Sequence, residues 1–477
     1  MLERGLLIGA HEVRSGTVHE VLNPASGVVI GNFVVADAEA VDRAVDMAAA
    51  AQTAWGSSSP DFRAQVLRTA AALIERDADA IARTLTLEQG KPVPDSRKEV
   101  LFGAEVLRYY ADRSALLDEE VRRTTNADFR SVVRHVPLGV VGGIVPWNYP
   151  VDLWCWKVAP ALMAGNAVVM KPPLETPLAA GMVARLLYEA GLPDGVLSDL
   201  PGGLEAGAAI STHRGIRGIS ATCSTAAGVA IMQAAAPTMK RLTLELGGNC
   251  PLVVLDDADI RAAAAAAARR SFSNAGQICI AVNRIVVMKS VADEFVGELA
   301  AIVDALHVGD PIEPDVVMGP TTTAAVLEKT QQHVADAIRR GARVVAGAST
   351  QTLAVDPIGH FMRPVVLDEV PVTASIAREE TFGPAVAVLR VDSEQDALRL
   401  ANDSMYGLAA YVYTGDSERG QTFARGLEYG GIGINVNDVT ELDAPFGGWK
   451  MSGFGRDLGP EALLGMTEPQ HIRTRLP

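Results

Sequence analysis

From about residue 130 onward, short apolar runs alternate with helical stretches, and this alternation limits the folds open to the chain. The strand-like runs 139–147 and 167–173 are followed by helical patterns at 151–165 and 177–191. Strands that alternate with helices favour a parallel sheet covered by helices. The sequence therefore predicts an α/β fold built on a doubly wound sheet.

Further helical patterns and a second αβ series flank this region. Residues 38–86 carry apolar residues at helical spacing, and 252–420 combine an Ala-rich helix with strand patterns such as "PAVAVLR" and "LAAYVYTG". The tail is rich in glycine. A chain of 477 residues exceeds the size that one hydrophobic core supports, so we expect two or three domains.

The charge balance and the cysteines exclude several classes of function. Lys and Arg total 42 against 57 Asp and Glu, and the formal charge of −15 disfavours binding to nucleic acid or to anionic lipid. No apolar run approaches the ~20 residues that a membrane span needs. The four cysteines form no CxxC pair, so we expect no metal site and no disulfide scaffold. With no signal-peptide pattern at the start, the expected location is cytoplasmic.

A doubly wound sheet binds ligands beyond the carboxyl ends of its strands. The predicted ends lie at 146–148, 170–172 and 222–224. A strict GxGxxG pattern is absent, because the glycines of "PGGLEAG" (201–207) have the wrong spacing. Periodicity thus indicates a nucleotide-type sheet without proving one.

Five stretches carry residues suited to chemistry. They are "PWNYP" with Asn148, "LELGGN" with Glu245, "NAGQICIAVNR" with Cys279, "EETFGP" with Glu380 and Phe382, and "PFGGWKMSGFGR". In this order they resemble the aldehyde dehydrogenase superfamily, and the resemblance covers almost the whole chain. It implies a Rossmann-type cofactor domain, an αβ catalytic domain and a small oligomerisation element. It also implies NAD(P)-dependent oxidation of an aldehyde to the carboxylic acid.

The catalytic residues that this resemblance implies suit the chemistry. A thiolate attacks an aldehyde carbonyl readily, so Cys279 is the expected nucleophile. Asn148 and the backbone N–H of the nucleophile are expected to hold the oxyanion, and Glu245 to activate the water that hydrolyses the thioester. Each residue has a structural alternative: Cys279 as a packing residue, Asn148 as a helix N-cap, and Glu245 as a buried charge held by a turn.

The resemblance also implies a binding site for NAD or NADP. Lys171 matches the lysine that reaches the adenosine ribose, and Glu380 the carboxylate that holds the nicotinamide ribose. Ser224 is expected to open a helix whose N-terminus faces the pyrophosphate. The expected cofactor residues are Val145, Pro146, Trp147, Lys171, Ser224, Gly247, Glu380 and Phe382.

Two positions depart from the family pattern near that cofactor site. Leu174 stands where a carboxylate often binds the adenosine ribose, and the loss of that charge favours tolerance of NADP. Cys223 stands where the family usually has glycine, which places a side chain at the close approach of helix and cofactor. Cys155, Cys223 and Cys250 have no motif around them and are expected to be packing residues.

The matching substrate channel is mostly apolar and aromatic. Relatives acting on succinic semialdehyde usually have Arg where this chain has Trp156, so we expect no carboxylated substrate. Aromatic rings suit aliphatic or aromatic aldehydes, or a betaine-type cation; the alternative for Trp156 is packing in the helix–sheet core. The expected substrate residues are Tyr149, Trp156, Ile278, Ile280 and Phe446.

The resemblance divides the chain into three parts. We expect a dinucleotide-binding domain at 1–118 and 138–245, a catalytic domain at 246–445, and an oligomerisation element at 119–137 and 446–477. An exposed sheet edge in that element predicts a homodimer or homotetramer. Two other functions stay open. One is a relative that passes the acyl group to coenzyme A, which commonly lacks the general-base Glu. The other is a catalytically silent structural or binding protein on the same fold.

Overall fold

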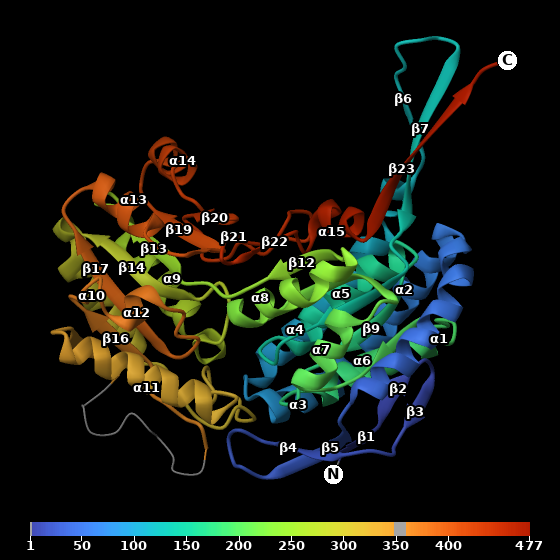
Figure 1. Ribbon diagram of the computed structural model, residues 1–477. Helices are drawn as coiled ribbons and strands as arrows, with labels where there is room; N and C mark the ends of the chain where they lie inside the picture. Colours follow the sequence, from blue (N-terminus) through green and yellow to red (C-terminus); the bar gives the residue numbers. More distant parts are fainter. Residues whose placement is uncertain (1, 348–358) are drawn as a thin grey trace.

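The computed structural model describes residues 2–347 and 359–477, and it contains two large sheets, each covered by helices on both faces (Figure 1). The first sheet has eight strands in the order β22-β12-β11-β8-β9-β10-β2-β3. Its strands are β2 (Leu6–Ile8), β3 (His11–Val13), β8 (Val140–Ile144), β9 (Ala167–Lys171), β10 (Leu197–Asp199), β11 (Ile216–Thr222), β12 (Arg241–Glu245) and β22 (Gly453–Phe454).

The central strands of this sheet run parallel, which confirms the predicted α/β class, while its outer strands are antiparallel. The register pairs Ile144 with Lys171 and Thr222 with Glu245. The carboxyl ends of these strands therefore meet along one edge. Glu245 also pairs with Gly453 of β22, so the C-terminal part of the chain completes the sheet.

Helices cover both faces of the first sheet because its strands alternate their buried residues. Val140 and Ile144 pack toward α1, α7 and α8, whereas Val141 and Val168 pack toward α5 and α6, with α2, α3 and α4 behind them. The helices are α1 (Ala38–Ser57), α2 (Pro60–Arg76), α3 (Ala78–Gln89), α4 (Val93–Ala111), α5 (Pro150–Met163), α6 (Leu178–Glu189), α7 (Leu204–Thr212) and α8 (Thr225–Ala235).

The second sheet has seven strands in the order β15-β16-β17-β14-β13-β19-β20, and all but β15 pair in parallel. Its strands are β13 (Cys250–Val254), β14 (Val282–Met288), β15 (Arg343–Ala346), β16 (Val365–Asp368), β17 (Ala385–Val391), β19 (Ala409–Tyr413) and β20 (Gly431–Ile434). Around it lie α9 (Ile260–Phe272), α10 (Lys289–Asp304), α11 (Ala324–Arg339), α12 (Ser375–Arg378), α13 (Glu394–Asn402) and α14 (Ser417–Arg425).

One hydrophobic cluster joins the two halves of the molecule. It runs from Leu107 on α4 and Trp154 on α5 to Phe272 on α9 and Phe295 on α10, and all four side chains are buried. Close-packed interiors resist displacement. The two sheets are therefore held in a fixed relation, which a site formed between them requires.

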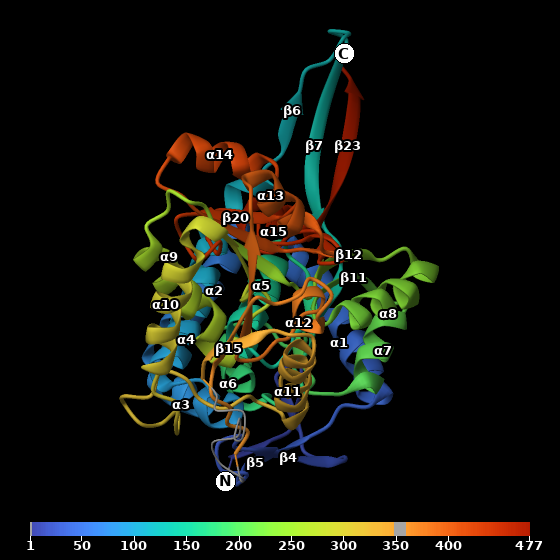
Figure 2. The same ribbon diagram turned by 90° about the vertical axis from the view of Figure 1, so that its left-hand side faces the viewer.

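A third sheet projects from the body like an arm (Figures 1 and 2). Its last strand pairs antiparallel with β7 from Thr467↔Pro137 to Arg475↔Phe129. The three strands are β6 (Glu120–Arg122), β7 (Phe129–Pro137) and β23 (Thr467–Arg475). Smaller elements are β1 (Leu2–Arg4), β4 (Val18–Leu22), β5 (Val29–Val34), β18 (Tyr406–Gly407), β21 (Trp449–Lys450) and α15 (Gly459–Gly465).

Two further properties concern only residues 2–347 and 359–477. None of the helices there combines the length and the apolarity that crossing a membrane requires. The same residues contain no group of three His, Cys, Asp or Glu side chains arranged to hold a metal ion.

Candidate active site

Asn148 lies just beyond the carboxyl end of β8, in the turn that leads into α5. The N-cap of α5 is Tyr149 and makes no side-chain cap bond, so the alternative of Asn148 as an N-cap is wrong. The Asn148 side chain points to a different segment instead: its Nδ2 donates to the carbonyl oxygen of Gln277 at 2.9 Å. Asn148 is 3% exposed. An amide from the first sheet is thereby fixed against the loop that carries Cys279.

That loop has an unusual backbone. It begins with a 3₁₀ segment, Ser273–Gly276, in which Asn274 and Ala275 have φ values of 50° and 54°. Gly276 follows with φ 76°, and a Cβ there would lie 2.3 Å from the carbonyl oxygen of Gly383. Left-handed non-glycine residues persist only where the surrounding contacts impose them, and they are frequent at functional sites.

A buried network of amide side chains imposes this conformation. Gln277 Nε2 donates to Asn274 O at 2.8 Å, and Gln277 Oε1 accepts from the N–H of Thr322 at 2.8 Å. Gln89 Nε2 donates to Asn274 Oδ1 at 2.9 Å, and Asn274 Nδ2 donates to Asn148 O at 3.1 Å. Sequence reasoning missed these residues. The available signal was polar amides within an otherwise apolar motif, "NAGQICIAV".

A buried ion pair supports the same turn from the other side. Lys91 pairs with Glu99 and donates to Asn148 O at 2.7 Å, and its ammonium lies 3.6 Å from the centre of the Tyr149 ring. Glu99 Oε1 accepts from the N–H of Val151 at 2.9 Å, at the start of α5. A carboxylate at a helix N-terminus satisfies free N–H groups and the helix dipole. The pair therefore fixes where α5 begins, and with it Asn148.

Cys279 and Glu245 face each other across the junction of the two sheets. Glu245 is 1% exposed, and neither of its carboxyl oxygens has a hydrogen-bond partner among the described residues. Burial raises the pKa of Glu245 to about 8, although the positive charge of Lys157 opposes the shift. Burial and the facing Glu245 raise the pKa of the Cys279 thiol well above its usual value. A thiol and a facing carboxyl whose pKa is raised can exchange a proton.

Lys171 and Ser224 occupy the neighbouring strand ends. Lys171 Nζ donates to Gly202 O at 2.9 Å, and burial lowers its pKa to about 8. Ser224 is the N-cap of α8, as expected, and its Oγ accepts from the N–H of Ala227 at 3.3 Å. At the end of β11, two residues before Ser224, Thr222 Oγ1 is buried and has no hydrogen-bond partner among the described residues. An unsatisfied hydroxyl beside a helix N-terminus suits a bound polar ligand such as a phosphate.

Glu380, Gly247 and Phe382 form the facing wall. Glu380 Oε1 accepts from the N–H of Gly248 at 2.9 Å, and burial raises its pKa to about 7. A Cβ at Gly247 would lie 2.6 Å from Glu380 Oε2, so a side chain there would displace the Glu380 carboxyl. Phe382 has φ 60°, and its ring meets that of Trp147 edge to face at 5.5 Å. The side chains predicted from separate motifs thus lie around one junction.

Most of the expected substrate residues are buried from solvent. Trp156 is 3% exposed and meets the ring of Phe446 edge to face at 5.1 Å. Its indole N–H has no acceptor among the described residues. Ile278 and Ile280 are buried on either side of Cys279, while Tyr149 is partly exposed. An unpaired buried donor disfavours pure packing as the explanation of Trp156.

The other cysteines and Leu174 differ in environment. Cys155 and Cys250 are buried, as expected of packing residues, but Cys223 is partly exposed. Its N–H donates to Glu245 O at 3.1 Å, and burial raises the pKa of its thiol to about 12. Leu174 packs against the small cluster formed by Phe33 and its neighbours, close to Gly203. No carboxylate stands at that position.

Comparison with known proteins decides the family. Residues 11–472 match the model of the aldehyde dehydrogenase family. The chain belongs to this family. The family accounts for the order of the motifs and for the two sheets that meet at Cys279.

Individual relatives of this aldehyde dehydrogenase act on different aldehydes. It is 37% identical to the NADP-dependent succinate-semialdehyde dehydrogenase of Escherichia coli, over 94% of this chain and 92% of the relative. It is also 37% identical to the betaine aldehyde dehydrogenase of Cereibacter sphaeroides, over 97% of this chain and 94% of the relative. A crystal structure of an aldehyde dehydrogenase from Brucella melitensis biovar abortus superimposes with a TM-score of 0.96, at 36% identity and 99% and 97% coverage.

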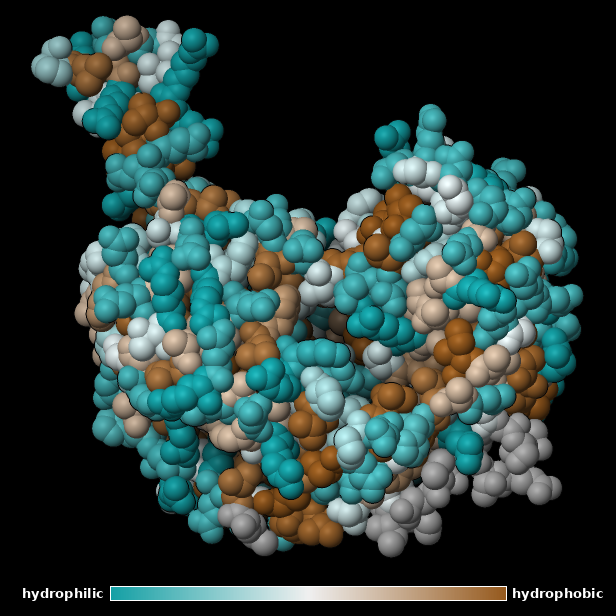
Figure 3. All heavy atoms as spheres, turned by 180° about the vertical axis from the view of Figure 1, so that it is seen from behind, coloured by the Kyte–Doolittle hydropathy of each residue, from teal (hydrophilic) through white to brown (hydrophobic). Residues whose placement is uncertain are grey.

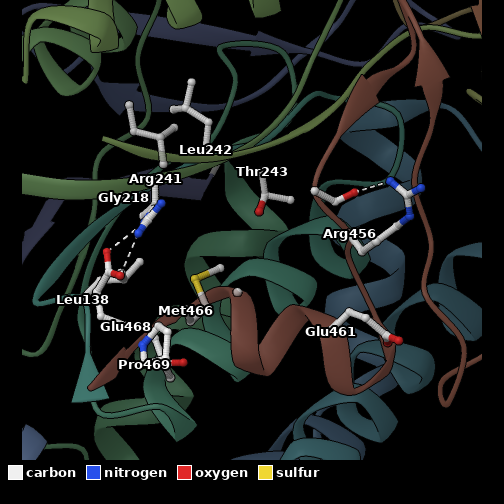
Figure 4. Close-up of a pocket in the computed structure, with 14 residues that line it drawn as sticks. Leu138, Gly218, Arg241, Leu242, Thr243, Arg456, Glu461, Met466, Glu468 and Pro469 are labelled. Atoms are coloured by element: carbon white, nitrogen blue, oxygen red, sulfur yellow. Dashed lines mark hydrogen bonds and ion pairs between the residues drawn. The ribbon is translucent and has the colours of Figure 1, made fainter. Parts of the chain in front are cut away.

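A cavity of about 430 Å³ lies elsewhere, at the base of the projecting arm (Figure 4). Arg241 and Glu468 form an ion pair across it, and Leu138 and Met466 contribute apolar walls. It opens at the amino ends of β11 and β12, whereas Glu245 lies at the carboxyl end of β12. This cavity is therefore separate from the group around Cys279.

We expect Gln277→Leu to lower kcat by about 10- to 100-fold, because it leaves Thr322 N–H and Asn274 O unpaired and loosens the loop carrying Cys279. Steady-state kinetics measures this, and thermal unfolding reports the accompanying loss of stability. The matched control is Gln332→Leu, on the exposed face of α11. Equal kinetics in the two variants would show that the network does not position the loop.

Proposed function

We propose that this aldehyde dehydrogenase oxidises an aldehyde to the free carboxylic acid through a covalent intermediate on Cys279. The observation that carries the proposal is the pair formed by the Cys279 thiol and the Glu245 carboxyl, whose two oxygens have no other partner in residues 2–347 and 359–477. A relative that transfers the acyl group to coenzyme A needs no such base. The amide of Asn148, fixed at the same junction, supplies the third group.

The reaction divides between these three side chains. Cys279 Sγ attacks the carbonyl carbon, and Glu245 accepts the thiol proton, so the attacking group is a thiolate. The carbonyl oxygen becomes negatively charged. Asn148 Nδ2 uses one hydrogen for Gln277 O and has a second for this oxyanion. Glu245 releases the thiol proton to solvent before hydrolysis. After oxidation leaves a thioester on Cys279, the ionised Glu245 takes a proton from the water that attacks it, and the Cys279 sulfur leaves as the thiolate.

NAD or NADP fits the strand ends described above. The proposed holding groups are Val145, Pro146, Trp147, Lys171, Ser224, Gly247, Glu380 and Phe382. The unpartnered Thr222 hydroxyl and the close approach of Glu380 to Gly247 support a ligand there. When bound, the nicotinamide supplies the acceptor for the hydride. Leu174 contributes no charge against a 2′-phosphate, which supports use of NADP. A similar structure, 3,6-anhydro-L-galactose dehydrogenase at 34% identity and TM-score 0.95, was solved in complex with NAP.

We propose an aliphatic, aromatic or betaine-type aldehyde as the substrate, and not a carboxylated one. The chain is equally identical to a succinate-semialdehyde dehydrogenase and to a betaine aldehyde dehydrogenase, so overall similarity does not indicate which class of aldehyde is the substrate. Local residues do: Trp156 and Phe446 present aromatic surface, together with the proposed channel residues Tyr149, Ile278 and Ile280. The Arg270 guanidinium nearby is already paired with Asp438, so it offers a carboxylated substrate no free cation.

Wild-type enzyme mixed with aldehyde and excess NADP or NAD is expected to give a burst of reduced cofactor and to release free acid without coenzyme A. Cys279→Ser abolishes both, because a hydroxyl is a far weaker nucleophile at neutral pH. Stopped-flow absorbance measures the burst, and chromatography the acid. Cys250→Ser is the matched control, since Cys250 is buried nearby and has no proposed role. Acid release that requires coenzyme A would favour the acylating relative.

The pH dependence of acid release follows from Glu245. A general base works only when ionised, and burial raises its pKa to about 8. We expect the rate at saturating cofactor to rise about tenfold per pH unit below that value and to level off above it. In Glu245→Gln the rate of acid release is expected to be much lower and no longer to rise with pH in this range. A rising limb that survives in Glu245→Gln would assign the base to another group.

We also propose three parts of the chain: a dinucleotide-binding domain at 1–118 and 138–245, a catalytic domain at 246–445, and an oligomerisation element at 119–137 and 446–477. We further propose that the protein forms a homodimer or homotetramer. Apolar side chains are exposed on the arm at Val121 and Ile472, and Figure 3 shows brown, hydrophobic atoms on the surface of the arm. The cavity at its base gives a second copy a place to pack. The free thiols support a cytoplasmic location.

Ile472→Lys is expected to shift the protein toward monomer, because it places a charge on the apolar arm. Light scattering measures the mass. Val317→Lys, which changes an exposed apolar residue away from the arm, is the control and keeps the wild-type mass. A monomeric wild-type protein, or an unchanged mass for Ile472→Lys, would contradict this role of the arm.

A further inference from the structure

One buried carboxyl near the junction has no use in the fold or in the proposed chemistry. Asp152 lies on α5 and is 9% exposed. Its Oδ1 makes no hydrogen bond, and it forms no ion pair within the described ranges 2–347 and 359–477. The N-terminus of α5 is already satisfied by Glu99. Buried charged groups are normally paired, so an unpaired one calls for a partner that binds from outside.

The two cations near Asp152 are already paired with other carboxylates. Lys91 pairs with Glu99, and Arg270 on α9 pairs with Asp438 in the loop after β20. Asp152 is left without a cationic partner of its own among the described residues. Burial and the nearby Glu99 raise its pKa well above the usual value, against the opposing effects of Trp156 N–H and Lys91. A cation beside it would reverse that shift.

Asp152 belongs to the same face of α5 as the proposed substrate residues. Tyr149 and Trp156 stand one helical turn before and after it, and residues at that spacing share a helix face. Asp152 lies in the first turn of the helix that begins just after Asn148. Trp156 Nε1, one turn on, makes no hydrogen bond of normal length among the described residues, but its N–H faces the Asp152 carboxyl and lowers its pKa. The carboxyl and the indole N–H thus lie together on the helix that follows the proposed oxyanion-binding amide.

We propose that Asp152 binds the ammonium group of an ω-aminoaldehyde, and that it makes the enzyme selective for short aldehydes with a primary amine at the far end. This inference rests on the proposed oxidation of an aldehyde at Cys279. The ammonium donates to the Asp152 Oδ1, and the ring of Trp156 adds cation–π attraction. The methylene chain between amine and carbonyl lies against the apolar wall that includes Phe446.

The same carboxyl disfavours the other charged substrates. A substrate carboxylate would face an unpaired acid at the place where its own partner should be, which costs free energy through repulsion. A trimethylammonium group keeps the cation–π attraction but has no N–H to donate to Oδ1. A primary amine is therefore the cation that satisfies Asp152 most completely.

The test compares 3-aminopropanal with butanal, which has nearly the same shape and no charge. Wild-type kcat/KM is expected to be at least tenfold higher for the aminoaldehyde. Asp152→Asn should lower kcat/KM for 3-aminopropanal by about 30- to 100-fold, the usual effect of removing one partner of a buried charged hydrogen bond, and change butanal by less than about threefold. Betaine aldehyde should fall between the two substrates in the wild type.

Asp95→Asn is the matched control, because Asp95 is a carboxylate of the same neighbourhood that is solvated and paired with Lys98. It should leave both kcat/KM values unchanged. Wild-type selectivity provides a reading that does not depend on how the variants fold. Equal use of 3-aminopropanal and butanal, or an equal loss of both in Asp152→Asn, overturns the assignment of Asp152 while oxidation of butanal still supports the proposed function. No oxidation of any aldehyde overturns both.

Discussion

The hydrogen bond from Asn148 to the carbonyl of Gln277 ties the two sheets together at the point where chemistry is proposed. Around it, Lys91 and Asn274 both donate to the backbone oxygen of Asn148, so the turn after β8 and the loop before β14 share one set of bonds. Either segment alone would be free to adopt other conformations. The left-handed backbone of the loop persists because the amides on both sides impose it.

Burial is the main cause of the pKa shifts at the candidate site. Glu245 and Glu380 are shifted upward in pKa and Lys171 downward, each chiefly because water is excluded. Groups in such surroundings exert strong electrostatic effects on a ligand and need little reorganisation when charge develops. We therefore interpret the buried polar groups without a partner among the described residues as ligand-binding groups. Asp152, like Glu245, is a buried carboxyl of this kind.

The sequence was sufficient for the regular parts of the fold and for the family. The predicted strand at 167–173 is β9, and the predicted helix at 151–165 is α5, because their apolar patterns are local. The strands β2, β3 and β22 were not predicted: they are two or three residues long, and β2 and β22 join the sheet through partners that are distant in sequence. The family resemblance identified Cys279 and Glu245 as the candidate nucleophile and general base. Gln277 and Asp152 were missed because burial and the absence of a partner are properties of the folded chain.

The pairing of Glu245 with Gly453 has a bearing on synthesis. The strand that presents this carboxyl is complete only when residues near the end of the chain have returned to lie beside it. Domains generally fold as they leave the ribosome, N-terminal parts first. A nascent polypeptide that already contains the thiol loop still lacks the edge that holds its base in place. A chain that stops before Gly453 would therefore carry Cys279 without the strand that pairs with Glu245.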